Sequence, residues 1–183
     1  MKDQSVVKGY AFLSYVQPLR REREDLWLRI RDELSPESRA FFDGQVFADQ
    51  WYPRRHLHDL MHAMEVATNG DERQFRELGS RAARYQLSMI YRAFFSFMTP
   101  ALVFRRAASI WRRQSSAGLF MVVEDGENYL IGKLVDSTLP KHMPLVIAGW
   151  SETIVAMLGK TPYPLEIETP APGQWIFRVR WVS

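Results

Sequence analysis

The sequence contains no cysteine among its 183 residues. This absence excludes a disulfide framework, a zinc site built from thiolates and a cysteine nucleophile, and it fits a reducing compartment. The start of the chain has no long apolar core and no small-residue cleavage site, so we expect no signal peptide. No run approaches the roughly 18 apolar residues that span a bilayer. We therefore expect a cytoplasmic protein without a transmembrane segment.

Motifs of familiar enzyme chemistry are also missing. The chain has no glycine-rich phosphate loop, no Ser-His-Asp pattern and no carboxylate-rich metal motif. Ser151 and Glu152 adjoin each other, but no histidine stands near them in the sequence to complete a nucleophile and its base. We therefore expect no catalytic residues, no cofactor and a non-enzymatic function.

The composition is nevertheless that of a folded protein. Hydrophobic residues make up 46% of the chain and aromatic residues 13%, which is enough to bury a sizeable core. The length suits one domain, and the sequence shows no internal repeat or low-complexity linker. We therefore expect residues 1–183 to form a single domain.

Hydrophobic periodicity predicts helices in the first half of the chain and mainly strands in the second. Ser35 and Pro36 are typical of a helix start, and Asp125-Gly126 is typical of a hairpin turn. Helical spacing is found at 19–34, 53–67, 72–98, 100–115 and 143–159, and strand-like patterns at 5–16, 117–137, 163–169 and 173–182. The sequence therefore predicts an α+β fold in which a helical N-terminal half packs on a small antiparallel sheet, in the order strand, helices, β-β-α-β-β.

Several marks along the chain resemble a known group of domains. They are "VVKGYAF" at 6–12, "LSPESRAFF" at 34–42, "WYP" at 51–53, "LGSRAARYQLSMIYRAFF" at 78–95, "TPALVFRRAASIWRR" at 99–113, "AGW" at 148–150 and "FRVRW" at 177–181. In this order the chain resembles a bacterial, myxobacterial-type family of unknown function. That family is related to 4-vinyl reductase-type, haem-NO-binding and TRAPP-like domains. The resemblance implies the same α+β fold.

The resemblance implies little about cofactors. In 4-vinyl reductase-type relatives the last hairpin carries paired cysteines, whereas this chain has "ETPAPGQWIF" there. Haem-binding relatives use an axial histidine in a core helix. None of the histidines of this chain, which are His56, His58, His62 and His142, maps onto that position. We therefore carry no metal or haem site over from these relatives.

Residues 58–62, "HDLMH", are one methylene short of the HExxH motif of zinc hydrolases. On a helical wheel His58 and His62 fall beside Arg54, away from an apolar face made of Leu57, Leu60, Met61 and Met64. Asp59 is shorter than the glutamate that activates zinc-bound water, and no obvious third ligand follows. His58 and His62 are therefore weak metal candidates on a solvated face, and a metal-dependent hydrolase is the least favoured function.

The helix over 78–95 is apolar on more than one side, which indicates a buried helix. It is either core or the wall of a pocket between this helix and the C-terminal sheet. In the second case its arginines would contact an apolar or anionic ligand. The candidate ligand-binding residues are Arg81, Arg84, Tyr85, Met89 and Arg92. The apolar stretch 143–159 predicts either a central helix covered by the sheet or a dimer contact.

The formal net charge of +3 is unevenly distributed. Residues 71–115 hold nine arginines and three acidic residues, whereas the flanks are close to neutral. This basic segment, from Arg73 to Arg113, would attract an anionic partner, but its scattered arginines favour a solvated helix surface. Ile110 and Trp111 within "FRRAASIWRR" are expected to pack inward. Because no nucleic-acid motif accompanies them, nucleic-acid binding is disfavoured.

Two functions remain in competition. The main interpretation is a non-enzymatic signalling or regulatory module that acts through protein–protein contacts, as a homodimer or a scaffold. The alternative is a sensor of a small apolar or anionic molecule, bound between helix 78–95 and the sheet. The absence of a polar catalytic cluster and the kinship with tethering subunits favour the first.

Overall fold

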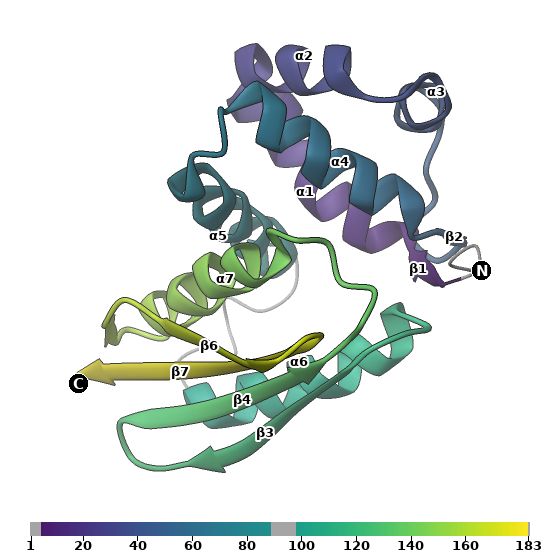
Figure 1. The fold of residues 1–183 in the computed structure, drawn as a ribbon. Helices are drawn as coiled ribbons and strands as arrows, with labels where there is room; N and C mark the ends of the chain where they lie inside the picture. The colour runs from purple at the N-terminus through teal and green to yellow at the C-terminus, as the bar shows by residue number, and fades with distance from the viewer. Residues whose placement is uncertain (1–4, 89–97, 183) are drawn as a thin grey trace.

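A computed structural model describes residues 5–88 and 98–182 of the chain. It places a group of N-terminal helices above an antiparallel sheet, as the sequence predicts (Figure 1). In chain order the elements are β1 (Val6–Lys8), α1 (Gly9–Glu22), α2 (Glu24–Glu33), α3 (Pro36–Asp43), β2 (Trp51–Pro53), α4 (Arg55–Ala67), α5 (Glu72–Ser88), α6 (Pro100–Gln114), β3 (Leu119–Asp125), β4 (Tyr129–Val135), α7 (Met143–Met157), β5 (Thr161–Pro162), β6 (Glu166–Ala171) and β7 (Gln174–Val182). The α+β class is confirmed.

The predicted strand over 5–16 is wrong after Lys8, because α1 begins at Gly9. The apolar residues of this stretch fit both the two-residue period of a strand and the 3.6-residue period of a helix. The helix prevails because it buries more apolar surface. Gly9 itself lies against the 44–50 loop: a Cβ there would lie 2.0 Å from the carbonyl oxygen of Phe47. The buried apolar residues of α1 recur at helical spacing and are Phe12, Val16 and Leu19.

The helices that follow largely agree with their start and stop signals. The single helix expected over 19–34 is broken at Arg23, whose φ of −142° leaves the helical region. Ser35 caps α3 as predicted, because its side chain accepts a hydrogen bond from the backbone N–H of Ser38. The "WYP" segment starts no helix: it forms β2, which pairs with β1.

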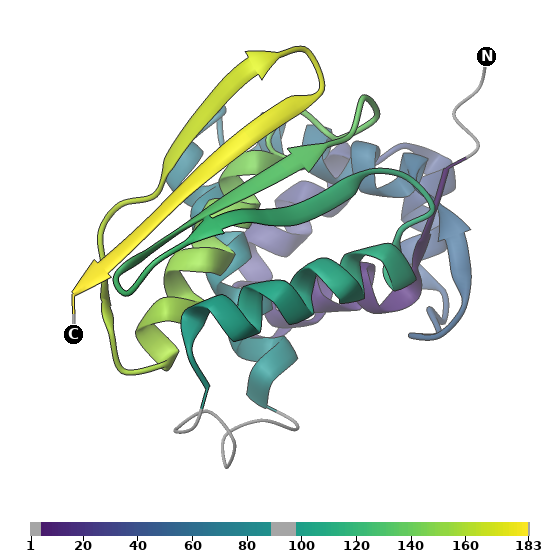
Figure 2. The same cartoon turned by 90° about the horizontal axis from the view of Figure 1, so that it is seen from below.

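The main sheet has the order β3-β4-β7-β5, and β6 also pairs with β7. All of these pairs are antiparallel, and the predicted hairpins β3–β4 and β6–β7 are confirmed. Both α6 and α7 lie on one side of this sheet (Figure 2). Leu130 and Leu134 of β4 point toward them and are fully buried, whereas Tyr129 and Val135 face outward and are exposed.

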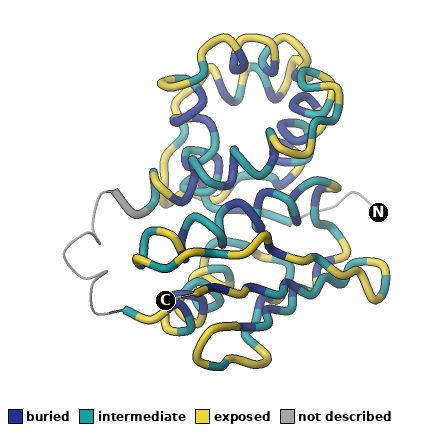
Figure 3. Tube along the Cα trace, turned by 90° about the vertical axis from the view of Figure 1, so that its left-hand side faces the viewer, coloured by how far each residue is buried: buried dark blue, intermediate teal, exposed yellow. Residues whose placement is uncertain are grey.

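Two hydrophobic cores follow from this arrangement, and buried positions alternate with exposed ones along the trace (Figure 3). One core lies among α1 to α5, which we call the helical lobe together with β1 and β2. The other lies between the sheet and the helices α6 and α7, which together we call the sheet lobe. The helix α7 contributes to both cores, so it is the central helix that the sequence allowed as one interpretation. Within the described ranges, no helix combines the length and apolar character needed to cross a bilayer.

Candidate functional site: a buried arginine at the lobe junction

Arg54 stands between β2 and α4, and its side chain is only 2% exposed. Its backbone N–H donates to the carbonyl of Ser5 at 2.9 Å, so the β1–β2 pair fixes its position. The helical wheel placed Arg54 on the polar face beside His58, and that placement is wrong. Arg54 is the N-cap of α4 and its backbone is already helical, so the error concerns the side chain: the wheel takes a charged residue to be solvated, whereas this one reaches the sheet lobe.

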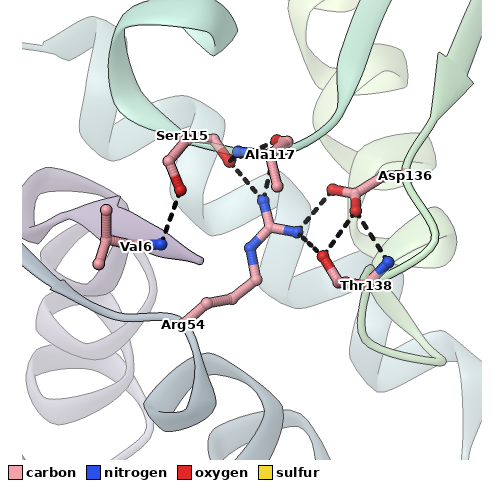
Figure 4. Close-up of polar contacts among 7 residues, drawn as sticks. Val6, Arg54, Ser115, Ala117, Asp136 and Thr138 are labelled. Atoms are coloured by element: carbon pink, nitrogen blue, oxygen red, sulfur yellow. Dashed lines mark hydrogen bonds and ion pairs between the residues drawn. The ribbon is translucent and has the colours of Figure 1, made fainter. Parts of the chain in front are cut away.

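The guanidinium of Arg54 bonds to two separate parts of the sheet lobe (Figure 4). Nη1 donates to Oδ2 of Asp136 at 2.6 Å and to Oγ1 of Thr138 at 2.8 Å. Nη2 donates to the hydroxyl of Ser115 and, at 3.0 Å, to the carbonyl of Ala117. One side chain of the helical lobe therefore holds the end of β4 and the segment after α6.

Asp136 is as deeply buried as its partner, with a side chain 1% exposed. Its second oxygen, Oδ1, accepts hydrogen bonds from the N–H of Thr138 at 2.9 Å and from the Thr138 hydroxyl at 2.8 Å. Gly118 leaves room for this carboxylate, because a Cβ at that position would lie 2.5 Å from Oδ2. Gly118 also has a φ of +83°, which disfavours other residues. The site is thus built around a paired charge.

A second set of bonds joins the lobes beside the ion pair. The N–H of Val6 donates to the hydroxyl of Ser116 at 2.8 Å, and the N–H of Ser116 donates to the carbonyl of Val6 at 3.0 Å. Buried charges are stable only when they are paired and hydrogen-bonded. The bonds from Arg54 to Asp136, Thr138, Ser115 and Ala117 meet that condition for Nη1 and Nη2 of the guanidinium, whereas Nε has no partner. The arrangement holds the two lobes in register, and its carboxylate and hydroxyl groups are engaged in these hydrogen bonds.

The histidines of the "HDLMH" segment belong to no group of three potential metal ligands among the described residues. His62 is exposed, with 71% of its side chain accessible, and lies on the outer side of α4. Oδ2 of Asp59 accepts hydrogen bonds from the N–H of Ser35 at 3.0 Å and from its hydroxyl at 2.7 Å, so Asp59 supports the start of α3. The apolar face predicted for this helix is confirmed, since its four residues are all buried: Leu57, Leu60, Met61 and Met64.

The two remaining histidines stack on aromatic rings; His56 is buried, whereas His142 is half-buried. His56 stacks on Phe41 with ring centroids 4.2 Å apart, and its Nδ1 lies 2.9 Å from the hydroxyl of Ser38. Burial and then the charge of Arg55 lower the pKa of His56, which favours the neutral ring. His142 stacks on Phe75, also at 4.2 Å.

Glu65 of α4 pairs with Lys141 and His142, which precede α7, and we expect this contact to make the stability depend on pH. A hydrogen bond from Lys141 at 2.6 Å, and then the neighbouring His142, lower the pKa of this carboxyl from 4.5 to about 2. Because the folded pKa is depressed, the stabilisation is complete above about pH 4.5 and is lost as the pH falls toward 2. We expect Glu65→Gln to flatten this part of the profile of unfolding free energy against pH, measured by urea titration. An unchanged profile would contradict the assignment.

The candidate ligand residues are only partly brought together. Arg81 forms ion pairs with Glu22 at 2.5 Å and Glu77 at 3.1 Å, so its charge is already neutralised. Arg84 is exposed and Tyr85 is half-buried. Met89 and Arg92 lie outside the described residues. Over residues 78–88, α5 packs on α7, which lies between α5 and the sheet.

The structure shows two open hollows elsewhere. One, of about 290 Å³, lies on the outer face of the sheet among ion-paired side chains such as Arg178 with Glu168 and Arg180 with Glu166. The other, of about 230 Å³, lies between α1 and the segment after α3, and apolar side chains form most of its wall. Its lining residues are Phe12, Leu13, Val16, Gln17, Arg20, Phe42, Gly44, Gln45 and Val46.

Comparison with solved structures identifies the fold. No family model matches the chain, and no curated protein matches its sequence. An alanine-to-glycine mutant of the unliganded Fe(II) H-NOX protein from K. algicida superposes with a TM-score of 0.72 at 12% identity, covering 96% of this chain and 97% of that one. The chain has the H-NOX fold. The haem-NO-binding branch of the predicted kinship is thereby supported at the level of fold.

Two further H-NOX-type structures agree with this likeness. An oxygen-binding H-NOX domain related to soluble guanylate cyclases gives a TM-score of 0.68 at 11% identity, with 96% of this chain and 95% of that one covered. A structure that describes modulation of haem redox potential by porphyrin distortion gives 0.66 at 12% identity, with 96% and 99% covered. The match extends over both lobes, so their arrangement is that of the H-NOX fold.

The residues of this chain do not fit a histidine-bound haem. All four histidines are described, and none projects from α6 or from the strands into the core of the sheet lobe. His56 and His142 are stacked against phenylalanines of the helical lobe, and His58 and His62 belong to α4. In the described part of the chain, no three histidine, aspartate or glutamate side chains come together as metal ligands. We derive no chemistry through haem for this chain.

Proposed function

We propose that this chain is a signalling module that uses the H-NOX fold to sense a small molecule without a histidine-bound haem. The likeness to an oxygen-binding H-NOX domain over 96% of the chain supports the sensor alternative over a protein scaffold. The observation that carries the proposal is the buried pair of Arg54 and Asp136, because it gives the two lobes a buried, charged connection through which a signal can pass. The module is non-enzymatic in this proposal, and kinship with 4-vinyl reductase-type and TRAPP-like domains stays a prediction.

The ligand site that we propose is the hollow beside α1, which we call the α1 hollow. Its volume of about 230 Å³ lies below the roughly 300–1,000 Å³ of drug-sized sites, so it suits a short molecule. At its edge, Arg20 donates to the carbonyl of Phe42 at 2.6 Å and lies over the ring of Trp27. Asp43, the nearest acid, is itself paired with Arg31 at 2.6 Å. An apolar chain with a carboxylate matches this combination of an apolar wall and a half-buried cation.

The α1 hollow is connected to the lobe junction by a short path. Gly44 and Val46 at its rim begin the loop that leads into β2, and Arg54 follows β2 directly. This loop is held to α1 by hydrogen bonds from the N–H of Gly9 to the Gln50 carbonyl at 2.8 Å and from the N–H of Tyr10 to the Ala48 carbonyl at 2.9 Å. A ligand that shifts the loop would therefore displace Arg54.

The test is thermal unfolding with a series of straight-chain carboxylates from butanoate to octanoate. We expect a concentration-dependent rise in Tm, because a ligand that binds only the folded state stabilises it by mass action. Gln17→Trp places a bulky ring at the exposed rim of the α1 hollow without altering a buried residue, and it should abolish the rise. Arg21→Met, on the same helix but outside the hollow, should retain it.

Native mass spectrometry of the freshly purified protein completes the test. Extra mass that is lost on denaturation and absent from Gln17→Trp would support the α1 hollow. Equal Tm shifts in both variants, or no shift with any carboxylate and no retained mass, would contradict this site. A Soret absorption band in the purified protein would overturn the conclusion on haem.

A further inference from the structure

Most of the described arginines of the basic segment that lack a carboxylate partner lie on one helix. In the basic segment 73–113, Arg73, Arg76 and Arg81 are neutralised by acidic partners. On α6, Arg105 pairs with Asp125, but three other arginines have no carboxylate partner among the described residues. These are Arg106, Arg112 and Arg113, and all are exposed. Among the described arginines of this segment, four lack a carboxylate partner, and three of these four lie on α6; the fourth is Arg84 on α5.

The same face of α6 also exposes apolar side chains. Leu102 is 43% exposed and Ile110 is 45% exposed. The prediction that Ile110 packs inward is wrong, although Trp111 does pack against the core of the sheet lobe. Successive helical residues are 100° apart, so two neighbours cannot both face the core here. Arginine is enriched in protein–protein interfaces, whose centres also bury apolar side chains, so this combination suits a partner-binding surface.

The exposed arginines are ordered along the helix axis. On a helical wheel, Arg105 and Arg112 form one column and Arg106 and Arg113 form another, with Leu102 and Ser109 between them. Each column repeats after seven residues, which is about 10.5 Å along the axis. A second helix with acidic residues at seven-residue intervals would present its charges at the same spacing.

We propose that the exposed face of α6 docks an acidic amphipathic helix of a partner protein. Glutamate or aspartate side chains of that helix would pair with Arg106, Arg112 and Arg113, and its apolar residues would cover Leu102 and Ile110. The β3–β4 hairpin beside α6 favours a single helix as the partner over a broad anionic surface. Asp125 lies beside Arg105, with Glu124 and Glu127 close to it in sequence, and this negative charge repels a broad anionic surface such as a membrane.

The position of α6 gives this docking a connection to the lobe junction. Ser115 and Ala117, which follow the last turn of α6, accept hydrogen bonds from Arg54. A shift of Arg54 would therefore alter the C-terminal end of the docking helix. The docking itself does not depend on the α1 hollow, so it can be tested without any small-molecule ligand.

The experiment uses two fluorescein-labelled helical peptides with the 15-residue length of α6. One carries paired glutamates at seven-residue intervals beside leucines, and the other has the same composition with its glutamates spread over all faces. Fluorescence anisotropy with the full chain should show tighter binding of the first peptide. This binding should weaken as salt rises from about 0.05 to 0.5 M, because screening shortens the range of surface charges.

Charge reversal locates the surface. Arg106→Glu with Arg113→Glu should weaken binding at least about tenfold, because rim charges then repel the peptide. Arg84→Glu, an exposed arginine on α5, should change it less than about twofold. Circular dichroism checks that each variant is folded. Equal binding of both peptides, or an equal loss in Arg84→Glu, would overturn the proposal, as would tighter binding to phosphatidylserine vesicles or duplex DNA than to the first peptide.

Discussion

Replacing Asp136 with asparagine is expected to lower the free energy of unfolding by about 3–5 kcal/mol. The substitution keeps the side-chain volume but leaves Arg54 as an uncompensated buried charge, since both side chains are almost completely buried. In a chain of this length such a loss corresponds to a fall in Tm of roughly 6–20 °C. Urea unfolding followed by far-UV circular dichroism measures it directly.

The matched control is Arg55→Met, which removes the ion pair between Arg55, the residue after Arg54, and Glu37. Both of those side chains are more than half exposed, so the loss should stay below about 1 kcal/mol. A double variant, Arg54→Met with Asp136→Leu, removes both charges and should regain at least about 2 kcal/mol over Asp136→Asn. If Asp136→Asn is no more destabilising than Arg55→Met, the pair does not hold the lobes together.

The double variant also separates stability from coupling. Its lobes would remain packed through apolar contacts, but the hydrogen bonds that Arg54 donates to Ser115 and Ala117 would be lost. We expect it to retain the Tm response to carboxylates, because the α1 hollow lies within the helical lobe. Hydrogen exchange at the end of α6 should then no longer respond to the ligand. An unchanged response would show that the signal takes another route.

The elements that the sequence predicted correctly are those with local signals. The cap at Ser35 and the helix start at residue 100 were both predicted. In the structure the hydroxyls of Ser35 and Thr99, each followed by proline, accept a backbone hydrogen bond. The turn between β3 and β4 also has a local signal, the pair Asp125-Gly126. The error over 5–16 has a physical reason: valine and aromatic residues favour a strand, whereas burial of Phe12 and Val16 depends on helices that come later in the chain.

The lobe junction could not be predicted from the sequence. Arg54 and Asp136 are 82 positions apart, and each is of a residue type that is almost always exposed. No local pattern distinguishes them from surface charges. The helical wheel, drawn from residue 53, misplaced Arg54 because it took a charged residue outside the apolar stripe to be solvated, whereas this side chain reaches the sheet lobe. The glycine at position 118 is a partial signal, because glycine is favoured where φ is positive, as it is here. That Gly118 lies against the carboxylate of Asp136 is visible only in the fold.

Replacing Gly79 with alanine is expected to lower the free energy of unfolding by at least the upper end of the roughly 1–3 kcal/mol typical of overpacking. A Cβ at Gly79 would lie 1.9 Å from the carbonyl oxygen of Val146, and one at Gly149 would lie 1.9 Å from that of Arg76. These contacts are with backbone atoms, so α5 and α7 must separate to admit a methyl group. The higher helix propensity of alanine, worth about 1 kcal/mol, offsets only part of this loss.

The control for this prediction is Gly44→Ala, at the end of α3. A Cβ there would lie 3.3 Å from the Ala40 carbonyl, and the φ of −80° suits any residue, so the change should stay within about 1 kcal/mol. Gly79→Ala and Gly149→Ala affect the same helix crossing, so their double variant should lose less than the sum of the single losses. Additive losses would show that the two glycines act separately. They would also contradict the close crossing of α5 and α7 on which the connection between the two cores depends.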